Sequence, residues 1–249
     1  MSYSKVSGPA WLNIATTGAL TGTPATPDFG ANSWTVLVSD GLGASGNAVL
    51  NITVDAAAPQ LTSTFVSIGA EDGYLLESTE TSNVGGTVSA NTTSTSALRM
   101  GDESNKRQYK SVVSFDTSSL PDGATIISAT LRLKRGTISS APTNLGAIQV
   151  DIIGGSGFGG ATALGTGDFQ AAAGATGVAT MSYPTSNGSI STGVLNATGL
   201  SLVNKTGKSQ FRVQFATDDD NDNRADYLGF YSAANATAAN RPRLVIVYQ

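Results

Sequence analysis

Apolar and polar residues alternate with a period of two along several short segments of the chain. The alternating apolar sets are Leu131/Leu133, Ile148/Val150/Ile152, Phe211/Val213/Phe215 and Leu244/Ile246/Tyr248. Successive side chains of a strand point to opposite faces, so this pattern predicts strands with one buried and one solvated face. It predicts strands at 130–134, 147–152, 210–215 and 243–248, and it places Arg132, Lys134, Gln149 and Arg212 on the solvated side. The run 109–115 is predicted to be a fifth strand.

Gly, Ser, Thr and Asn fill the segments between these strands, which predicts loops there. No long segment has apolar residues at the helical period of 3.6 together with caps. The only expected helical turn is a short one at 168–174, capped by Asp168 and ended by Gly174. The pattern therefore predicts an all-β fold, an antiparallel β-sandwich of jelly-roll or Greek-key topology.

The first 55 residues form a separate pattern. Alternating runs at 33–39 and 47–54 flank the turn-forming 40–43, which predicts a β-hairpin. Together with Trp11-Leu12, Leu20-Thr-Gly-Thr-Pro24, Asp28, Gly30 and Val38-Ser-Asp-Gly41, this segment resembles the cadherin-like, immunoglobulin-type repeats of bacterial surface proteins. We expect a partial repeat of this kind at 1–55, a linker at 56–60, and a second β domain at 61–249.

The resemblance covers only the later part of such a repeat, because a sandwich of this type needs about seven strands over ~100 residues. One interpretation is that the sequence is a fragment or a processed product, in keeping with its opening Met-Ser-Tyr-Ser-Lys, which has no export leader. The other is that a neighbouring chain supplies the missing strand, since an incomplete sandwich exposes unpaired edge groups.

Composition narrows the possible chemistry. The chain of 249 residues has no cysteine and no histidine, which excludes thiolate nucleophiles, zinc fingers and Ser-His-Asp triads. Its 14 Lys and Arg against 18 Asp and Glu give a net charge of −4 and no basic stripe, so neither nucleic acid nor an anionic membrane surface is an expected partner. No apolar run approaches the ~20 residues of a membrane span.

The densest carboxylate cluster is the run Asp218-Asp-Asp-Asn-Asp-Asn223, followed by Asp226. Oxygen ligands at alternate positions, Asp218, Asp220 and Asp222, fit a calcium loop, because Ca²⁺ takes six to eight oxygens in a flexible geometry. The run is not an EF-hand, since it lacks the glycine and the closing glutamate. The alternative is a solvated acidic turn partly offset by Arg224.

Several segments of the second domain occur in the same order as in a known domain family. They are Leu76-Glu-Ser-Thr79, Leu98-Arg-Met-Gly-Asp102, Tyr109 to Asp116, Leu120 to Leu133, Tyr227-Leu-Gly-Phe-Tyr-Ser232 and Asn240-Arg-Pro-Arg-Leu244. In these residues the domain resembles, over about 68–248, the DNRLRE domain family of bacterial and archaeal surface proteins and polysaccharide-degrading enzymes. Part of that family is treated as carbohydrate-binding modules. The resemblance implies an extracellular jelly-roll sandwich without catalytic residues.

By analogy with calcium-stabilised sugar-binding sandwiches, Glu77 would join the aspartates Asp218, Asp220, Asp222 and Asp226 in one calcium site. For contact with sugar we expect the basic and aromatic set Arg99, Lys106, Arg107, Tyr109 and Lys110. Arginine forks bind carboxylates in a bidentate manner, so this set suits an anionic polysaccharide. The alternative is that 105–108 is a solvated turn balancing Asp102 and Glu103.

Three functions from different classes follow. We favour a non-catalytic surface module that binds polysaccharide or mediates adhesion through neighbouring surface-protein domains. The alternative is a structural subunit of a filament or adhesin, assembled by strand donation to the N-terminal domain. A polysaccharide-cleaving enzyme is disfavoured by the absence of histidine and by the resemblance to a binding module. The sequence also does not indicate that two of the glutamates Glu71, Glu77, Glu80 and Glu103 face each other.

Overall fold

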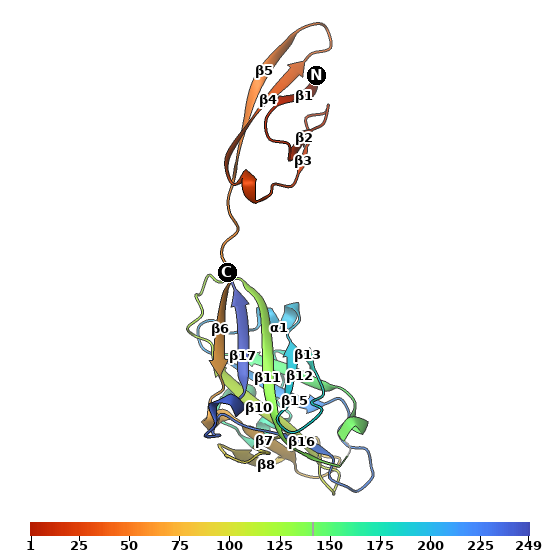
Figure 1. Cartoon of the computed structure of the whole chain (residues 1–249). Helices are drawn as coiled ribbons and strands as arrows, with labels where there is room; N and C mark the ends of the chain where they lie inside the picture. The colour runs from red at the N-terminus through yellow and green to blue at the C-terminus, as the bar shows by residue number, and fades with distance from the viewer. Residues whose placement is uncertain (141) are drawn as a thin grey trace. The chain divides into compact units, whose positions relative to one another are not determined.

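The computed structural model describes residues 1–140 and 142–249 (Figure 1). The chain forms two compact units, Met1–Pro59 and Gln60–Gln249. Both units are built of antiparallel strands, and helix α1 (Ala197–Ser201) is the single α-helix among the described residues. The predicted all-β fold of antiparallel strands is therefore confirmed.

The first unit contains two small antiparallel sheets. Strands β1 (Ser2–Ser7), β4 (Gly30–Ser39) and β5 (Ser45–Val54) form one in the order β1-β4-β5, and β2 (Leu12–Ile14) pairs with β3 (Leu20–Gly22) in the other. A 3₁₀ turn, η1 (Thr26–Asp28), precedes β4. The hairpin predicted at 33–54 is the β4–β5 pair. Trp11 and Trp34 meet edge to face at 5.0 Å, in the small core that Leu12 and Val36 complete.

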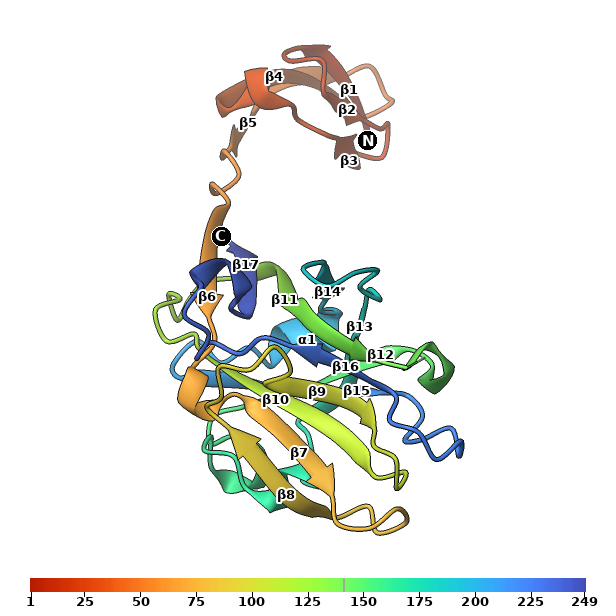
Figure 2. The same ribbon diagram turned by 60° about the horizontal axis from the view of Figure 1, so that its bottom comes forward.

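The second unit is one large, curled antiparallel sheet (Figure 2). Its path is β13-β12-β15-β10-β9-β16-β11-β17-β6, with β14 added to β11, β7 to β10 and β8 to β7. The strands are β6 (Leu61–Val66), β7 (Gly73–Glu77), β8 (Gly85–Ala90), β9 (Leu98–Asp102), β10 (Gln108–Asp116), β11 (Ile126–Ser139), β12 (Ile148–Gly154), β13 (Ala175–Met181), β14 (Ile190–Val194), β15 (Lys208–Phe215), β16 (Tyr227–Phe230) and β17 (Arg243–Tyr248). Short 3₁₀ turns lie between them: η2 (Gly69–Glu71), η3 (Pro142–Leu145), η4 (Phe158–Gly160), η5 (Thr166–Phe169) and η6 (Ala238–Asn240).

Strand β11 links the two halves of this sheet. Its first part pairs with β17 and β14, and from Arg135 onward it pairs with β16. The register shifts between Arg135 and Thr137. Gly136 lies at this shift, and a Cβ there would come within 2.1 Å of the Thr95 carbonyl oxygen. A side chain does not fit at this position, so the glycine permits the close approach of the 91–97 segment.

Each of the five predicted strands coincides with an observed one, and their apolar sets fill the main core, with Leu131, Val150, Phe211 and Ile246 fully buried. The prediction that Arg212 is solvated is wrong. The segment carrying η4 and η5 folds over this face of β15, so Arg212 is buried and pairs with Asp151 at 2.8 Å. Its Nη1 donates to the carbonyl oxygens of 168, 169 and 171. Under this segment lies a second, smaller core of Leu75, Val112, Phe158 and Phe169.

Asp72, directly after η2, is fully buried. Its Oδ2 accepts hydrogen bonds from the Ser67 hydroxyl at 2.6 Å and from the Ala233 backbone at 2.9 Å. Burial raises the pKa of Asp72 from 3.8 to about 7, against the lowering effect of these bonds. The folded chain therefore binds a proton that the unfolded chain releases between about pH 4 and 7.

We predict that the free energy of unfolding falls as pH rises from 5 to 7.5, because the folded state binds more protons than the unfolded state over this interval. Asp72→Asn, which stays neutral, should flatten this slope. Urea unfolding at pH 5 and pH 7.5 measures both slopes, and Asp122→Asn on an exposed turn is the matched control. Equal slopes for Asp72→Asn and the parent chain would contradict the assignment.

Candidate functional site

Three tyrosine rings surround the guanidinium of Arg99. Its central carbon lies 4.8 Å from the ring centre of Tyr74, 5.5 Å from that of Tyr109 and 5.0 Å from that of Tyr227. The rings also meet edge to face, Tyr74 with Tyr109 at 5.3 Å and Tyr109 with Tyr227 at 5.8 Å. We call these four residues the tyrosine–arginine cluster.

Strand alternation and pairing assemble this cluster from four strands. Arg99 lies between buried Leu98 and Met100 on β9, so its side chain points away from the main core. Gly101 of β9 pairs with Tyr109 of β10 and with Tyr227 of β16. Gly101 has φ +125°, and a Cβ there would lie 2.0 Å from the Asp226 carbonyl oxygen. The glycine thus allows the close contact that brings the rings together.

Arg99 is held by neutral groups. Its Nη1 donates to the Tyr109 hydroxyl at 3.4 Å and its Nη2 to the Ser96 hydroxyl at 3.2 Å, while its buried Nε has no hydrogen-bond partner. In the described part of the chain no carboxylate forms an ion pair with it. Burial raises the pKa of Tyr109 above 10, so its hydroxyl stays protonated at neutral pH. Within the described residues, the cation of this cluster therefore has no counter-charge.

Of the residues expected to contact sugar, Arg99 and Tyr109 lie together and the other three do not join them. Lys106 pairs with Glu80 at 3.4 Å and donates to Asn221, and Arg107 pairs with Glu103 at 2.6 Å. The Arg107 hydrogen bond lowers the pKa of Glu103 and raises that of Arg107.

Lys110 follows Tyr109 directly on β10, so its side chain lies on the opposite face of the strand. It lies 4.0 Å from the ring centre of Phe169, beside the smaller core. Burial lowers the pKa of Lys110 to about 8.

Sequence reasoning missed Tyr74 and Tyr227. Tyr74 is the second residue of β7, and Tyr227 is the first residue of β16. Both strands are short, and their sequence patterns are too brief to assign. Their approach to Arg99 depends on the pairing of β16 with β9 and of β7 with β10, which joins segments far apart in the chain. A tyrosine at a strand start was the available signal, and it does not specify a partner.

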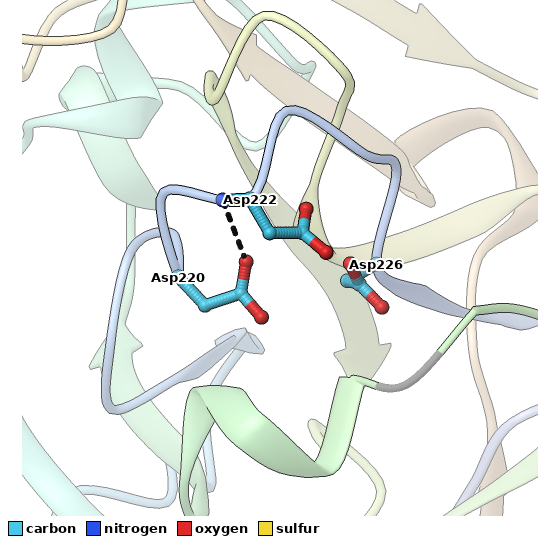
Figure 3. Close-up of side chains that lie close together, drawn as sticks. All are labelled: Asp220, Asp222 and Asp226. Carbon is cyan, nitrogen blue, oxygen red and sulfur yellow. Dashed lines mark hydrogen bonds between the residues drawn. The ribbon is translucent and has the colours of Figure 1, made fainter.

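Three aspartates gather in the loop before β16 (Figure 3). Oxygens of Asp220, Asp222 and Asp226 all lie within 4.8 Å of one another. The Asp222 amide donates to the Asp220 carboxylate at 3.3 Å, and the buried Asp226 donates its amide to Asp102 Oδ1 at 3.0 Å. Such an all-oxygen set could bind a hard metal ion.

The other two carboxylates of the expected calcium site lie outside this triad. Asp218 accepts the amide of Asp219 at 3.1 Å. Glu77 is buried on β7, where it accepts the Asn83 amide at 2.5 Å and the Gln108 amide at 3.3 Å. Backbone donors therefore already satisfy Glu77.

Asp102, at the end of β9, is a neighbour of the triad that the sequence analysis did not assign to it. Burial, followed by the charges of Asp226 and Asp220, raises its pKa to about 7. Burial is the largest cause of this shift, and the neighbouring carboxylates add to it.

A known family model matches part of the first unit. Residues 1–55 match the family model described as "Putative Ig domain", which confirms the immunoglobulin-type resemblance of this segment. No curated protein matches the chain. Among solved structures, one described as "Structural basis for the promiscuous specificity of the carbohydrate-binding modules from the beta-sandwich super family" aligns with 11% identity over 100% of this chain and 98% of that chain. Its TM-score is 0.21, too low to carry a conclusion about this chain.

Within the described residues, none of the helices has the length and hydropathy of a membrane span.

Proposed function

We propose that the chain is a non-catalytic module of an extracellular, bacterial or archaeal surface protein, and that its second unit binds polysaccharide at the tyrosine–arginine cluster. One observation carries the proposal. Arg99 is a partly buried cation with no carboxylate partner among the described residues, and three tyrosine rings surround it. Buried charges are normally paired, as Arg212 is with Asp151, so an unpaired one favours a ligand that completes it.

The chemistry of the cluster suits a sugar. Tyrosine offers an apolar ring to the C–H face of a pyranose and a hydroxyl to its polar edge. Tyr74 and Tyr227 are both partly exposed, so a ligand can reach them. The guanidinium presents several donors in a fixed plane, which suits hydroxyl and carboxylate oxygens. An acidic polysaccharide would supply the missing negative charge.

The immunoglobulin-type unit at 1–55 supports the extracellular setting, since repeats of this type are typical of surface proteins. For the second unit the support is the resemblance of its strand segments to the DNRLRE family. Both units fit an adhesive or binding module beside other domains of a surface protein.

We predict that Tyr74→Ala and Tyr227→Ala each weaken polysaccharide binding at least tenfold, about 1.4 kcal/mol, because each removes a ring from the cluster. Arg99→Lys should weaken binding to an acidic polymer similarly, since it keeps the charge and loses the planar fork. Affinity electrophoresis in gels containing polygalacturonate, alginate or neutral xylan detects binding, and calorimetry with soluble oligosaccharides measures it.

Tyr231→Ala is the control, because Tyr231 lies outside the cluster. Circular dichroism verifies that every variant is folded. Unchanged affinity of the two tyrosine variants and of Arg99→Lys would place the binding surface elsewhere.

We further propose that the triad of Asp220, Asp222 and Asp226 binds calcium. The donor set is all oxygen, and three carboxylates at this spacing repel one another unless a cation lies between them. The ion would hold the 218–226 loop, which leads directly into Tyr227 of the cluster.

We predict that calcium at about 100 times its Kd raises the melting temperature by roughly 5–10 °C relative to EDTA, because a ligand of the folded state stabilises it by mass action. The double variant D220N/D222N should lose this shift, whereas Asp122→Asn should keep it. A differential scanning fluorimetry series in CaCl₂ makes the measurement. Equal melting temperatures in calcium and EDTA would reduce the triad to a solvated acidic turn.

A second candidate function is assembly by strand addition to the first unit. Strand β5 pairs only with β4 among the described residues, and its sequence Ser45–Val54 contains no charge and no proline to block a further strand. Val49 of this edge is 68% exposed. Apolar side chains, among them Ile14, Leu20 and Leu50, line a hollow of about 420 Å³ beside it.

This second function predicts oligomers whose mass rises with protein concentration and which Val49→Lys abolishes by placing a charge on the edge. Light scattering coupled to size exclusion, from low to high protein concentration, tests it. Thr53→Lys, also on β5, tests whether a charge elsewhere on the edge has the same effect. A monodisperse monomer at the highest concentration would count against assembly by the chain itself.

A further inference from the structure

Four basic side chains line one small hollow in the second unit, although the chain as a whole is acidic. Arg132 and Lys134 come from β11, Arg243 from β17, and Arg241 from the segment after η6. The hollow has a volume of about 140 Å³, and the other lining residues are Leu133, Ile190 and Ala239. We call the four cations the basic cluster. It is separate from the tyrosine–arginine cluster, with which it shares no residue.

Strand register places two of these cations directly opposite each other. Arg132 of β11 pairs with Arg243 of β17. Like charges at directly opposed positions of an antiparallel pair destabilise the sheet. In the described part of the chain none of the four forms an ion pair with a carboxylate. Among the residues that the structure describes, no ion pair compensates this repulsion.

Neutral acceptors hold three of the four side chains in place. Lys134 donates to the Asn240 side chain at 2.9 Å, Arg241 Nε to the Asn235 carbonyl at 2.9 Å, and Arg243 Nη2 to the Ala238 carbonyl at 3.4 Å. These bonds orient the cations and leave their charge without an opposite partner. Held in this way, the cations lose less conformational freedom when an anion binds.

The basic cluster lies at one end of a four-stranded face, β14-β11-β17-β6, of which β11, β17 and β6 are seen side by side in Figure 1. Beyond Arg132 and Arg243 the same face continues through Thr130, Val245 and Thr64, which pair in adjacent strands. This surface offers small and β-branched side chains next to the cations. An extended polymer could lie along it with an acidic group in the hollow.

The chemistry of the hollow selects an oxyanion. Guanidinium forks bind carboxylates and sulfates in a bidentate manner, and a hollow of about 140 Å³ can accommodate such a group. None of the lining residues is aromatic, so no ring is present there to stack a nucleic acid base.

We propose that the basic cluster is a second glycan-binding site, which takes a carboxylate or sulfate group of an acidic polysaccharide. This inference rests on the proposed function. It specifies that the polysaccharide is acidic, and it assigns the binding of the acidic group to a surface separate from the tyrosine–arginine cluster. Binding at this face would neutralise the opposed arginines, and affinity would fall with added salt as the charges are screened.

The experiment compares polygalacturonate with its fully methyl-esterified form, which keeps the backbone and removes the charge. We expect the chain to bind the acid form more tightly, and R132Q/R243Q to weaken that binding at least tenfold while binding of neutral xylan stays unchanged. The control K5Q/K205Q removes two charges outside both clusters and outside the 218–226 loop, and it should retain affinity. Melting temperatures verify folding, and that of R132Q/R243Q should be no lower than the parent's, because the variant relieves a repulsion.

Each remaining outcome overturns the inference in a distinguishable way. If R132Q/R243Q binds polygalacturonate as tightly as the parent chain, the basic cluster is not a binding site. The proposed function would still stand in that case. Tighter binding to a DNA oligonucleotide of equal charge, or to vesicles containing phosphatidylserine, would assign the cluster to phosphate groups instead. Absence of binding to every polysaccharide tested would overturn the proposed function and this inference together.

Discussion

The continuous backbone pairing of β11 is the constraint on which the rest of the second unit depends. One half of the strand pairs with β17 and β14, and the other half pairs with β16. The change of partner occurs at Gly136, where the 91–97 segment approaches too closely for a side chain. The first half carries Arg132 and Lys134, and the second half fixes the strand that carries Tyr227. A single strand therefore positions elements of both candidate binding surfaces.

The arginines of this unit differ in how their charge is compensated. Arg212 is buried and paired with Asp151, with three backbone carbonyls completing its hydrogen bonds. Arg99 has tyrosine rings and neutral hydroxyls, and Arg132 faces another arginine. Removing a buried, paired charge is costly, so Arg212 serves the fold. The uncompensated cations contribute less to stability, and this is the physical reason to assign them to ligands.

The sequence pattern was sufficient for the fold class, since each segment in which period-two alternation was found lies in an observed strand. It was insufficient for Arg212, because alternation distinguishes the two faces of a strand without showing that the 155–174 segment covers one of them. The site residues divide similarly. Asp220, Asp222 and Asp226 are near in sequence and lie together, whereas Asp102 and Tyr74 reach their sites only through pairing of distant strands. Register between distant segments is the information that a single sequence lacks.

Net charge describes this molecule poorly, because its charges are segregated. The triad of Asp220, Asp222 and Asp226 concentrates negative charge in one loop, and the basic cluster concentrates positive charge on β11, on β17 and on the segment after η6. At physiological ionic strength the field of an exposed charge is screened over about 8 Å, so a ligand at one region responds mainly to the charges within that distance. A total of −4 therefore excludes a uniformly basic surface and does not exclude a local anion site. Exposed charges must be assigned to faces by strand register before composition can limit the partners of a β-sandwich.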